Sequence, residues 1–415
     1  MKFRNKLTFH SLVYTFSNFL NKGIGFLLLP ILTRILTPED YGHIAMFTLW
    51  TAILVPLISL NSSSAVVRFY YDTEKKILAS YIGGALILSV SMSLLFVTIT
   101  LIFSSPLSSF LSLPTIWLVA GVLNSLFLTI STIYLGILRV EERSLTYAVL
   151  QNTSSLLNAG LSLYLVVILY TGWKGRTGGI FIANVVMGLT IIYFMLKEKL
   201  VDLQIKTSQI KELLFFGGPL ILHNLTGILA ASTDKIFLNN MIGVKSVGLY
   251  NVSYAYASII GMIANSIHLA FVPYAYERIK KGDYRKVWET GVKIIGIVAF
   301  LFIVLLFFSP FYYKYYLGKS FSSASKFFVF LGVGEAITSV YYLGATFNFW
   351  YKKTVYISGI TLSKFIANLF LNYTLIKIMG DSGAAVATMI SSILAAALSL
   401  TTGFIFYRKY RKNSG

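Results

Sequence analysis

The chain has 415 residues, of which 56% are hydrophobic and only 12% are charged. An ordinary soluble domain carries about 25% charged residues, so this class is excluded and the composition predicts an all-α, polytopic membrane protein. The chain has no cysteine and only four histidines, none of them paired at metal-ligand spacing. Disulfides, thiolate metal sites and cysteine nucleophiles are therefore excluded, and we expect no metal, no cofactor and no catalytic residue.

Long apolar runs follow one another from the N-terminus onward. A basic head, with Lys2, Arg4 and Lys6, precedes the first run, which is too long for a cleaved signal peptide and is interpreted as a retained helix. Each run is long enough to cross the hydrocarbon core, which needs about 20 residues. Twelve membrane-spanning helices are predicted, at residues 11–36, 43–66, 78–103, 114–138, 145–170, 178–196, 213–240, 247–273, 291–309, 323–349, 354–376 and 382–406.

The connecting segments differ in their content of Lys and Arg. Twenty-four of these residues fall on the side of the two termini and eight on the other side. The positive-inside rule therefore predicts that both termini of this multi-pass protein are cytoplasmic. The net charge of +20 follows from this topology and from attraction to anionic membrane lipids, so no nucleic acid partner is expected.

The chain also repeats itself with a period near 206 residues. Six helices return the chain to its starting side, so the two halves are predicted to be parallel repeats. The predicted domains are residues 1–200, a cytoplasmic linker at 201–212, and residues 213–415. The repeat rests on the alignment of residues 36–42 with 242–248, of 175–178 with 380–383, and of Arg143 and Asn158 with Lys353 and Asn368.

Four segments resemble one family of transporters. They are TFSNFLNKGIGFLLLPILTRILTPEDYGHIAMF near the N-terminus, STDKIFLNNMIGVKSVGLYNVSYAYA, VPYAYERIKKGDYRK and GWKGRTGG. The chain resembles the Wzx-type O-antigen or polysaccharide repeat-unit flippases of the multidrug/oligosaccharidyl-lipid/polysaccharide exporter superfamily. The resemblance implies two six-helix bundles around a central cavity that opens alternately to each side. It also implies translocation of undecaprenyl-diphosphate-linked oligosaccharides for surface polysaccharide or lipopolysaccharide synthesis, beside a polysaccharide polymerase and a chain-length regulator.

Positive side chains within or at the ends of the spans are candidates for binding the diphosphate. A charge near the bilayer centre costs about 2.5–3.5 kcal/mol even on insertion scales, so Lys22 in the first span is expected to have a function. Lys235, Arg34 and Lys364 are the further candidates, although Arg34 can simply reach the outer headgroups and Lys364 can pair with an acid. Amides are candidates for contacting the sugar, although interhelical hydrogen bonding is the better explanation for most of them. They are Asn21, Asn61 and Asn224.

Two carboxylates lie inside predicted spans, Asp234 and Glu335. They are candidates for binding a proton or a sodium ion whose gradient drives transport, and the alternative is a fixed ion pair between helices. His223 and His268 are weaker candidates for the same coupling, because most buried histidines are hydrogen-bonded core residues.

Two other functions stay open at this point. A cation-coupled multidrug exporter of the same superfamily would differ only in substrate, although more cations than acids in the spans favour an anionic cargo. An integral-membrane glycan polymerase or ligase would need a large outer loop for its chemistry, and the longest predicted one covers only residues 309–322.

Overall fold

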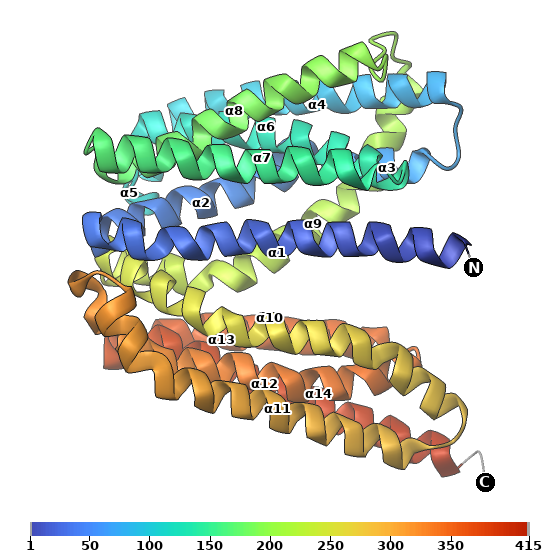
Figure 1. Cartoon of the computed structure of the whole chain (residues 1–415), viewed down its shortest axis with the longest axis vertical. Coiled ribbons are helices and arrows are strands. Elements are labelled where there is room, and N and C mark those ends of the chain that lie inside the picture. The colour runs from blue at the N-terminus through green and yellow to red at the C-terminus, as the bar shows by residue number, and fades with distance from the viewer. Residues whose placement is uncertain (1, 413–415) are drawn as a thin grey trace. The chain divides into compact units, whose positions relative to one another are not determined.

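The computed structural model describes the backbone of residues 2–412 and the side chains of these residues except 2–8, 11, 12, 18, 22 and 410–412. Within this part the chain is helical throughout and has no strand, which confirms the predicted all-α class (Figure 1). The helices are α1 (Lys2–Ile35), α2 (Pro38–Ser59), α3 (Ser62–Phe69), α4 (Lys75–Ile102), α5 (Ser104–Leu111), α6 (Thr115–Val140), α7 (Ser144–Leu163), α8 (Gly172–Lys197), α9 (Thr207–Met241), α10 (Val244–Lys280), α11 (Tyr284–Phe311), α12 (Ser325–Trp350), α13 (Thr354–Met379) and α14 (Ser382–Lys412), with short π or 3-10 segments at Tyr164–Ile168, Tyr312–Tyr316 and Lys319–Ala324.

Eleven of the described helices are long and apolar enough to cross a membrane. The predicted span at residues 145–170 corresponds to α7, which has sufficient length but is too polar to be counted with them. Between residues 151 and 162 this helix carries a glutamine, two asparagines, a threonine and three serines. The protein is thus a multi-pass membrane protein in which one long helix of the first half is distinctly polar.

The chain forms two compact units, Met1–Ser232 and Thr233–Gly415, and the boundary lies within α9. Residues 207–212 of the predicted linker form the first turns of this helix. The helices pack in the same order inside each unit. In the first unit α2 packs on α4 and α6, and α6 and α7 pack on α8. In the second unit α10 packs on α11 and α12, and α12 and α13 pack on α14. Five long helices of each unit thus pack in the same order, which agrees with the predicted internal repeat.

The alignment of the two repeats changes along the chain. Helices α2 and α10 begin 206 residues apart, at Pro38 and Val244, whereas α8 and α14 begin 210 apart. The predicted pairing of residues 175–178 with 380–383 is therefore wrong by about one helical turn. Arg143 and Lys353, each directly before a helix, and Asn158 and Asn368 keep the 210-residue spacing.

Local sequence signals set the limits of α2. Thr37 caps its start: the Asp40 amide donates to Thr37 Oγ1 at 3.1 Å, and Asp40 Oδ2 accepts from the Thr37 amide at 2.9 Å. This reciprocal pair satisfies backbone donors that the first turn leaves open. At the other end, Leu60 and Asn61 have φ of 47° and 51° and separate α2 from α3. The predicted single span 43–66 is therefore divided into two helices.

Arg143 joins the turn between α6 and α7 to the end of α8. Its guanidinium donates to both oxygens of Glu198, at 2.8 and 2.7 Å, and Tyr134 donates to the same carboxylate at 3.2 Å. The hydrogen bonds from Arg143 lower the pKa of Glu198 below its usual value. Because the folded-state pKa is lowered, the pair stabilises the fold above the ordinary glutamate pKa, and this stabilisation is lost as the pH falls through the lowered pKa.

We therefore expect Glu198→Gln to destabilise the protein at pH 7 by on the order of 1 kcal/mol, because the pair is partly exposed. The difference from the wild type should shrink when the pH is lowered below the pKa of Glu198. Thermal unfolding of the two proteins in detergent at pH 7 and at progressively lower pH measures this. A difference that does not change with pH would show that the ionised pair does not contribute.

Candidate functional site

The most densely hydrogen-bonded charged group of the second unit is the Asp234 carboxylate on α9, which is only 8% exposed. Its Oδ1 accepts from Asn372 Nδ2 at 2.7 Å and from Asn368 Nδ2 at 3.3 Å, both on α13. Its Oδ2 accepts from the Tyr250 hydroxyl of α10 at 2.5 Å and from Thr388 Oγ1 of α14 at 2.7 Å. Four neutral donors from three other helices thus replace water around one buried negative charge.

The helical spacing of the donors explains how this cluster forms. Asn368 and Asn372 are four residues apart, so both amides project from one face of α13. Asn372 Nδ2 also donates to Asn368 Oδ1 at 3.0 Å, which fixes the two amides relative to each other. Among the described side chains, Asn372 Oδ1 is buried and has no hydrogen-bond partner. One acceptor oxygen in this cluster is therefore left for a donor or a cation.

Three further charged groups of the same unit form one electrostatic cluster with Asp234. Lys235 and Lys364 both interact electrostatically with this carboxylate, and Lys364 also interacts with Glu335. Glu335 on α12 is hydrogen-bonded to the Tyr254 side chain of α10. The structure therefore brings four of the predicted site residues together as two acids and two bases.

Gly261 on α10 makes room for the Glu335 carboxylate. A Cβ added at Gly261 would overlap Glu335 Oε2. The overlapping group is the end of a flexible side chain, so a larger residue would displace the carboxylate without forcing the helices apart. Gly261 thus determines where this charge is placed.

In the first unit, a line of polar side chains joins α1 to α7. Ser17 donates to Asn152 Oδ1 at 3.1 Å, and Ser155 donates to Asn21 Oδ1. Asn21 also donates to the Ser17 carbonyl at 2.8 Å. These bonds explain why α7 carries so many polar residues, because polar groups within a bilayer require partners.

The remaining predicted site residues are dispersed. The side chain of Lys22 lies outside the described residues, and Arg34 is exposed in the last turn of α1. Asn224 donates to Asn61 at 2.7 Å and joins the first half of α9 to the turn after α2. His223 is exposed, and His268 stacks on Tyr342 with 4.3 Å between ring centres. Among the described side chains, no hydrogen bond joins either histidine to Asp234 or Glu335, and the coupling role expected of them stays a prediction.

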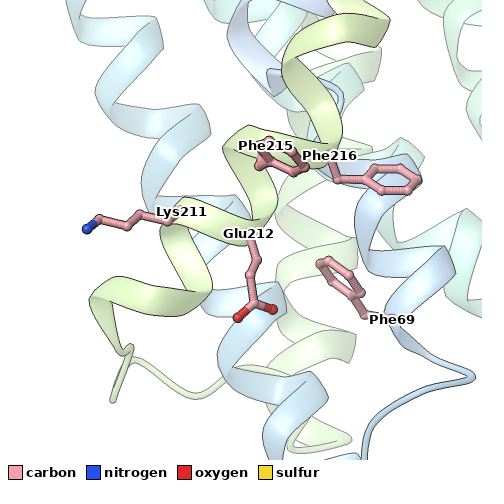
Figure 2. Close-up of a pocket in the computed structure, with 5 residues that line it drawn as sticks. All are labelled: Phe69, Lys211, Glu212, Phe215 and Phe216. Atoms are coloured by element: carbon pink, nitrogen blue, oxygen red, sulfur yellow. The ribbon is translucent and has the colours of Figure 1, made fainter.

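An open pocket of about 420 Å³ lies between α3 and the start of α9 (Figure 2). Its walls are mainly the rings of Phe69, Phe215 and Phe216. Lys211 is directed away from Phe69 and Phe216, and the Glu212 carboxylate accepts a hydrogen bond from Tyr81. The pocket is mainly apolar and none of the predicted site residues lines it, so it is not the candidate site.

Comparison with known proteins decides the family. The family model of the polysaccharide biosynthesis proteins matches residues 9–278, which is more than half of the chain. The chain belongs to this family. The capsular polysaccharide biosynthesis protein CapF of Staphylococcus aureus is 26% identical over 408 residues, which cover 95% of this chain and 97% of CapF. The Lsg locus putative protein 1 of Haemophilus influenzae is 23% identical over 398 residues, covering 92% and 96% of the two chains.

Solved structures show which fold this member of the polysaccharide biosynthesis family has. The lipid II flippase MurJ in an inward closed conformation superposes with a TM-score of 0.75 at 15% identity and covers 95% of this chain and 87% of MurJ. An inward-facing multidrug resistance MATE transporter of the MOP superfamily superposes with a TM-score of 0.74 at 16% identity, covering 97% and 96% of the two chains. The chain therefore has the fold of the MOP superfamily, and the predicted resemblance is confirmed.

Several residues of the candidate site were not predicted from the sequence. Tyr250, Asn372 and Thr388 were not singled out, although the pair Asn368 and Asn372 at four-residue spacing within an apolar helix was a usable signal. Among the described residues, no group of three or more His, Asp or Glu side chains could hold a metal ion. The groups hydrogen-bonded to the Asp234 carboxylate are instead neutral amides and hydroxyls.

Proposed function

We propose that the protein is a flippase that moves undecaprenyl-diphosphate-linked oligosaccharide repeat units from the cytoplasmic to the periplasmic leaflet by alternating access. The product would serve O-antigen or other surface polysaccharide synthesis, with a polymerase and a chain-length regulator acting on it afterwards. The observation that carries the proposal is the family match to polysaccharide biosynthesis proteins on a chain with the MOP fold. The half-buried lysines Lys235 and Lys364 offer positive charge to a diphosphate.

Reconstituted protein tests the proposal directly. Proteoliposomes would carry a fluorescent undecaprenyl-diphosphate-linked oligosaccharide in one leaflet, and a membrane-impermeant glycosidase would report how much glycan reaches the other leaflet. We expect transfer that depends on the protein, with protein-free liposomes as the control. Transfer no faster than in the protein-free liposomes would contradict the proposed function.

A cation-coupled multidrug exporter is the second candidate, favoured by the superposition on a MATE transporter. The same proteoliposomes loaded with a cationic dye distinguish the two functions. Dye efflux without glycan transfer would favour the exporter. An integral-membrane polymerase or ligase would instead lengthen or transfer the glycan in this assay, which product analysis would detect.

We propose that Asp234 is the coupling group, with Glu335 as a second carboxylate. A proton or a sodium ion would neutralise Asp234, and Asn368, Asn372 and Thr388 offer oxygen atoms beside it once the amides turn. Asn372 Oδ1 is buried and has no hydrogen-bond partner among the described residues, which supports cation binding. Such an oxygen would be satisfied by becoming a ligand of the cation. Neutralising this carboxylate would then change how α9, α10, α13 and α14 are held together during the transport cycle.

The position of the Glu335 carboxylate is testable through Gly261. We expect Gly261→Ala to displace this carboxylate and to reduce gradient-driven transport to the same extent as Glu335→Gln, while the unfolding temperature changes little. The double variant should be no worse than either single one, because both remove the same interaction. Gly359→Ala on α13 is the matched control, since an added Cβ there meets no atom within 4 Å. Additive losses in the double variant would contradict the assignment.

A further inference from the structure

Arg176 of the first unit is a cation that takes no part in the site around Asp234. It lies in the second turn of α8, inside a segment long and apolar enough to span a membrane, and is only partly exposed. Its Nη1 donates to Asn158 Oδ1 and to Ser162 Oγ, the latter at 2.5 Å, and both acceptors are neutral. Tyr41 of α2 is its other neighbour.

Close packing of α8 on α7 fixes this guanidinium in place. Asn158 and Ser162 are one helical turn apart on α7 and present both acceptors to the same side. Gly179, three residues after Arg176, lies against the backbone of Ser162, where a Cβ would approach the Ser162 amide nitrogen to 2.7 Å. The glycine thus allows the two helices to approach at the level of the arginine, and Arg176 is held rigidly.

The charge of Arg176 has no counterion in the described part of the chain. No carboxylate interacts with it there, although a buried or half-buried cation is normally paired. A guanidinium has five N–H donors, and the two hydrogens of Nη1 are engaged with Asn158 and Ser162. The donors of Nη2 and Nε have no hydrogen-bond partner among the described residues. These two nitrogens form one edge of the fork, which matches the two oxygens of a phosphate or a carboxylate.

The corresponding positions of the second repeat contact a group of the opposite charge. Asn368 and Asn372, which correspond to Asn158 and Ser162 at the 210-residue spacing, surround the anion Asp234. In the first unit the same two positions surround a cation. The two repeats thus use the same helix position for opposite charges. In the second unit Lys235 and Lys364 supply the charge opposite to that of Asp234, whereas no described residue does so for Arg176.

We propose that Arg176, oriented by Asn158 and Ser162, forms an oxyanion-binding site that takes a phosphate or carboxylate group of the transported molecule. The inference rests on the proposed function, in which the cargo carries a diphosphate and can carry acidic sugars. With both termini cytoplasmic, as the charge bias predicts, the start of α8 lies at the outer end of the first unit. The site would therefore hold the anion late in translocation, near the leaflet where the cargo is released.

Thermal unfolding of the full-length protein in detergent tests the site with defined probes. Inorganic pyrophosphate, glucuronate and chloride would be compared at equal ionic strength, because a ligand that binds only the folded state raises the unfolding temperature. We expect pyrophosphate, glucuronate or both to raise it by roughly 3 °C or more relative to chloride in the wild type. The increase should be lost in Arg176→Gln and kept in Lys174→Gln, which removes the same charge from an exposed side chain two residues away.

A second variant keeps the test decisive if Arg176→Gln fails to fold. Asn158→Asp would give Arg176 an internal carboxylate, so the protein should fold normally and lose its response to both anions. A response to pyrophosphate alone assigns the site to the diphosphate, a response to glucuronate alone assigns it to acidic sugars, and a response to both assigns it to oxyanions in general. No response in the wild type, or an equal response in Arg176→Gln, would overturn the proposal.

The glycan-transfer assay separates this inference from the proposed function. A wild-type protein that responds to anions through Arg176 but transfers no lipid-linked glycan would contradict the function and leave the anion site in place. A protein that transfers the glycan at an unchanged rate in Arg176→Gln, and shows no anion response, would contradict only the site.

Discussion

Asp234→Asn is expected to reduce gradient-driven transport by more than about 10-fold while the protein stays folded in the membrane. Asparagine has nearly the same shape but cannot carry the negative charge that a proton or a sodium ion would neutralise. Its oxygen can still accept from Asn368 and Asn372. The Tyr250 and Thr388 hydroxyls can rotate and accept from the new amide nitrogen, since a hydroxyl is both donor and acceptor.

Transport in proteoliposomes with an imposed proton or sodium gradient measures this effect and identifies the ion. Asp72→Asn is the control, because this aspartate is exposed and paired with Arg68 on the surface, at 2.5 Å. The unfolding temperature of the Asp234 variant should stay close to that of the wild type. Full gradient-driven transport by Asp234→Asn would remove this residue from the coupling mechanism, and indifference of the wild type to both gradients would remove ion coupling altogether.

Gly344→Ala is expected to destabilise the second unit strongly. A Cβ at Gly344 of α12 would overlap the backbone of Ser399 and Leu400 on α14, and backbone atoms cannot rotate away as a side chain can. Inserting a group into a packed core typically costs about 1–3 kcal/mol, and we expect the upper end of this range here. Separation of the helices would also weaken the bonds from Asn348 Nδ2 to the Ser399 carbonyl and to Thr402 Oγ1, both 3.1 Å long.

Thermal unfolding in detergent and the amount of protein in the membrane report this loss. Gly296→Ala on α11 is the matched control, because no atom lies within 4 Å of an added Cβ at that position. The control should be unaffected or slightly stabilised, since alanine is favoured over glycine in a helix by up to about 1 kcal/mol. Equal unfolding temperatures for the two variants would show that α12 and α14 do not pack as closely as the structure indicates.

The class, most of the helices and the internal repeat could be predicted from the sequence alone. Hydrophobic runs of membrane-spanning length are a local property, so the predicted spans agree with the described helices to within several residues at most ends. The 210-residue spacing of Asn158 and Asn368 was also visible in the sequence. Local composition did not reveal the break at Leu60 and Asn61, because a left-handed turn of two non-glycine residues leaves no strong signal.

Which polar groups contact one another depends on tertiary packing. Asp234 and Asn372 are 138 residues apart, and a hydrogen bond between them depends on how α9, α13 and α14 pack, which no local pattern contains. Arg176 precedes the predicted span at residues 178–196, yet the structure places it inside α8. Gly179 allows this helix to pack on α7 and brings the arginine to Asn158. A buried charge needs a partner because it has lost its water, and these groups become buried only when the helices assemble.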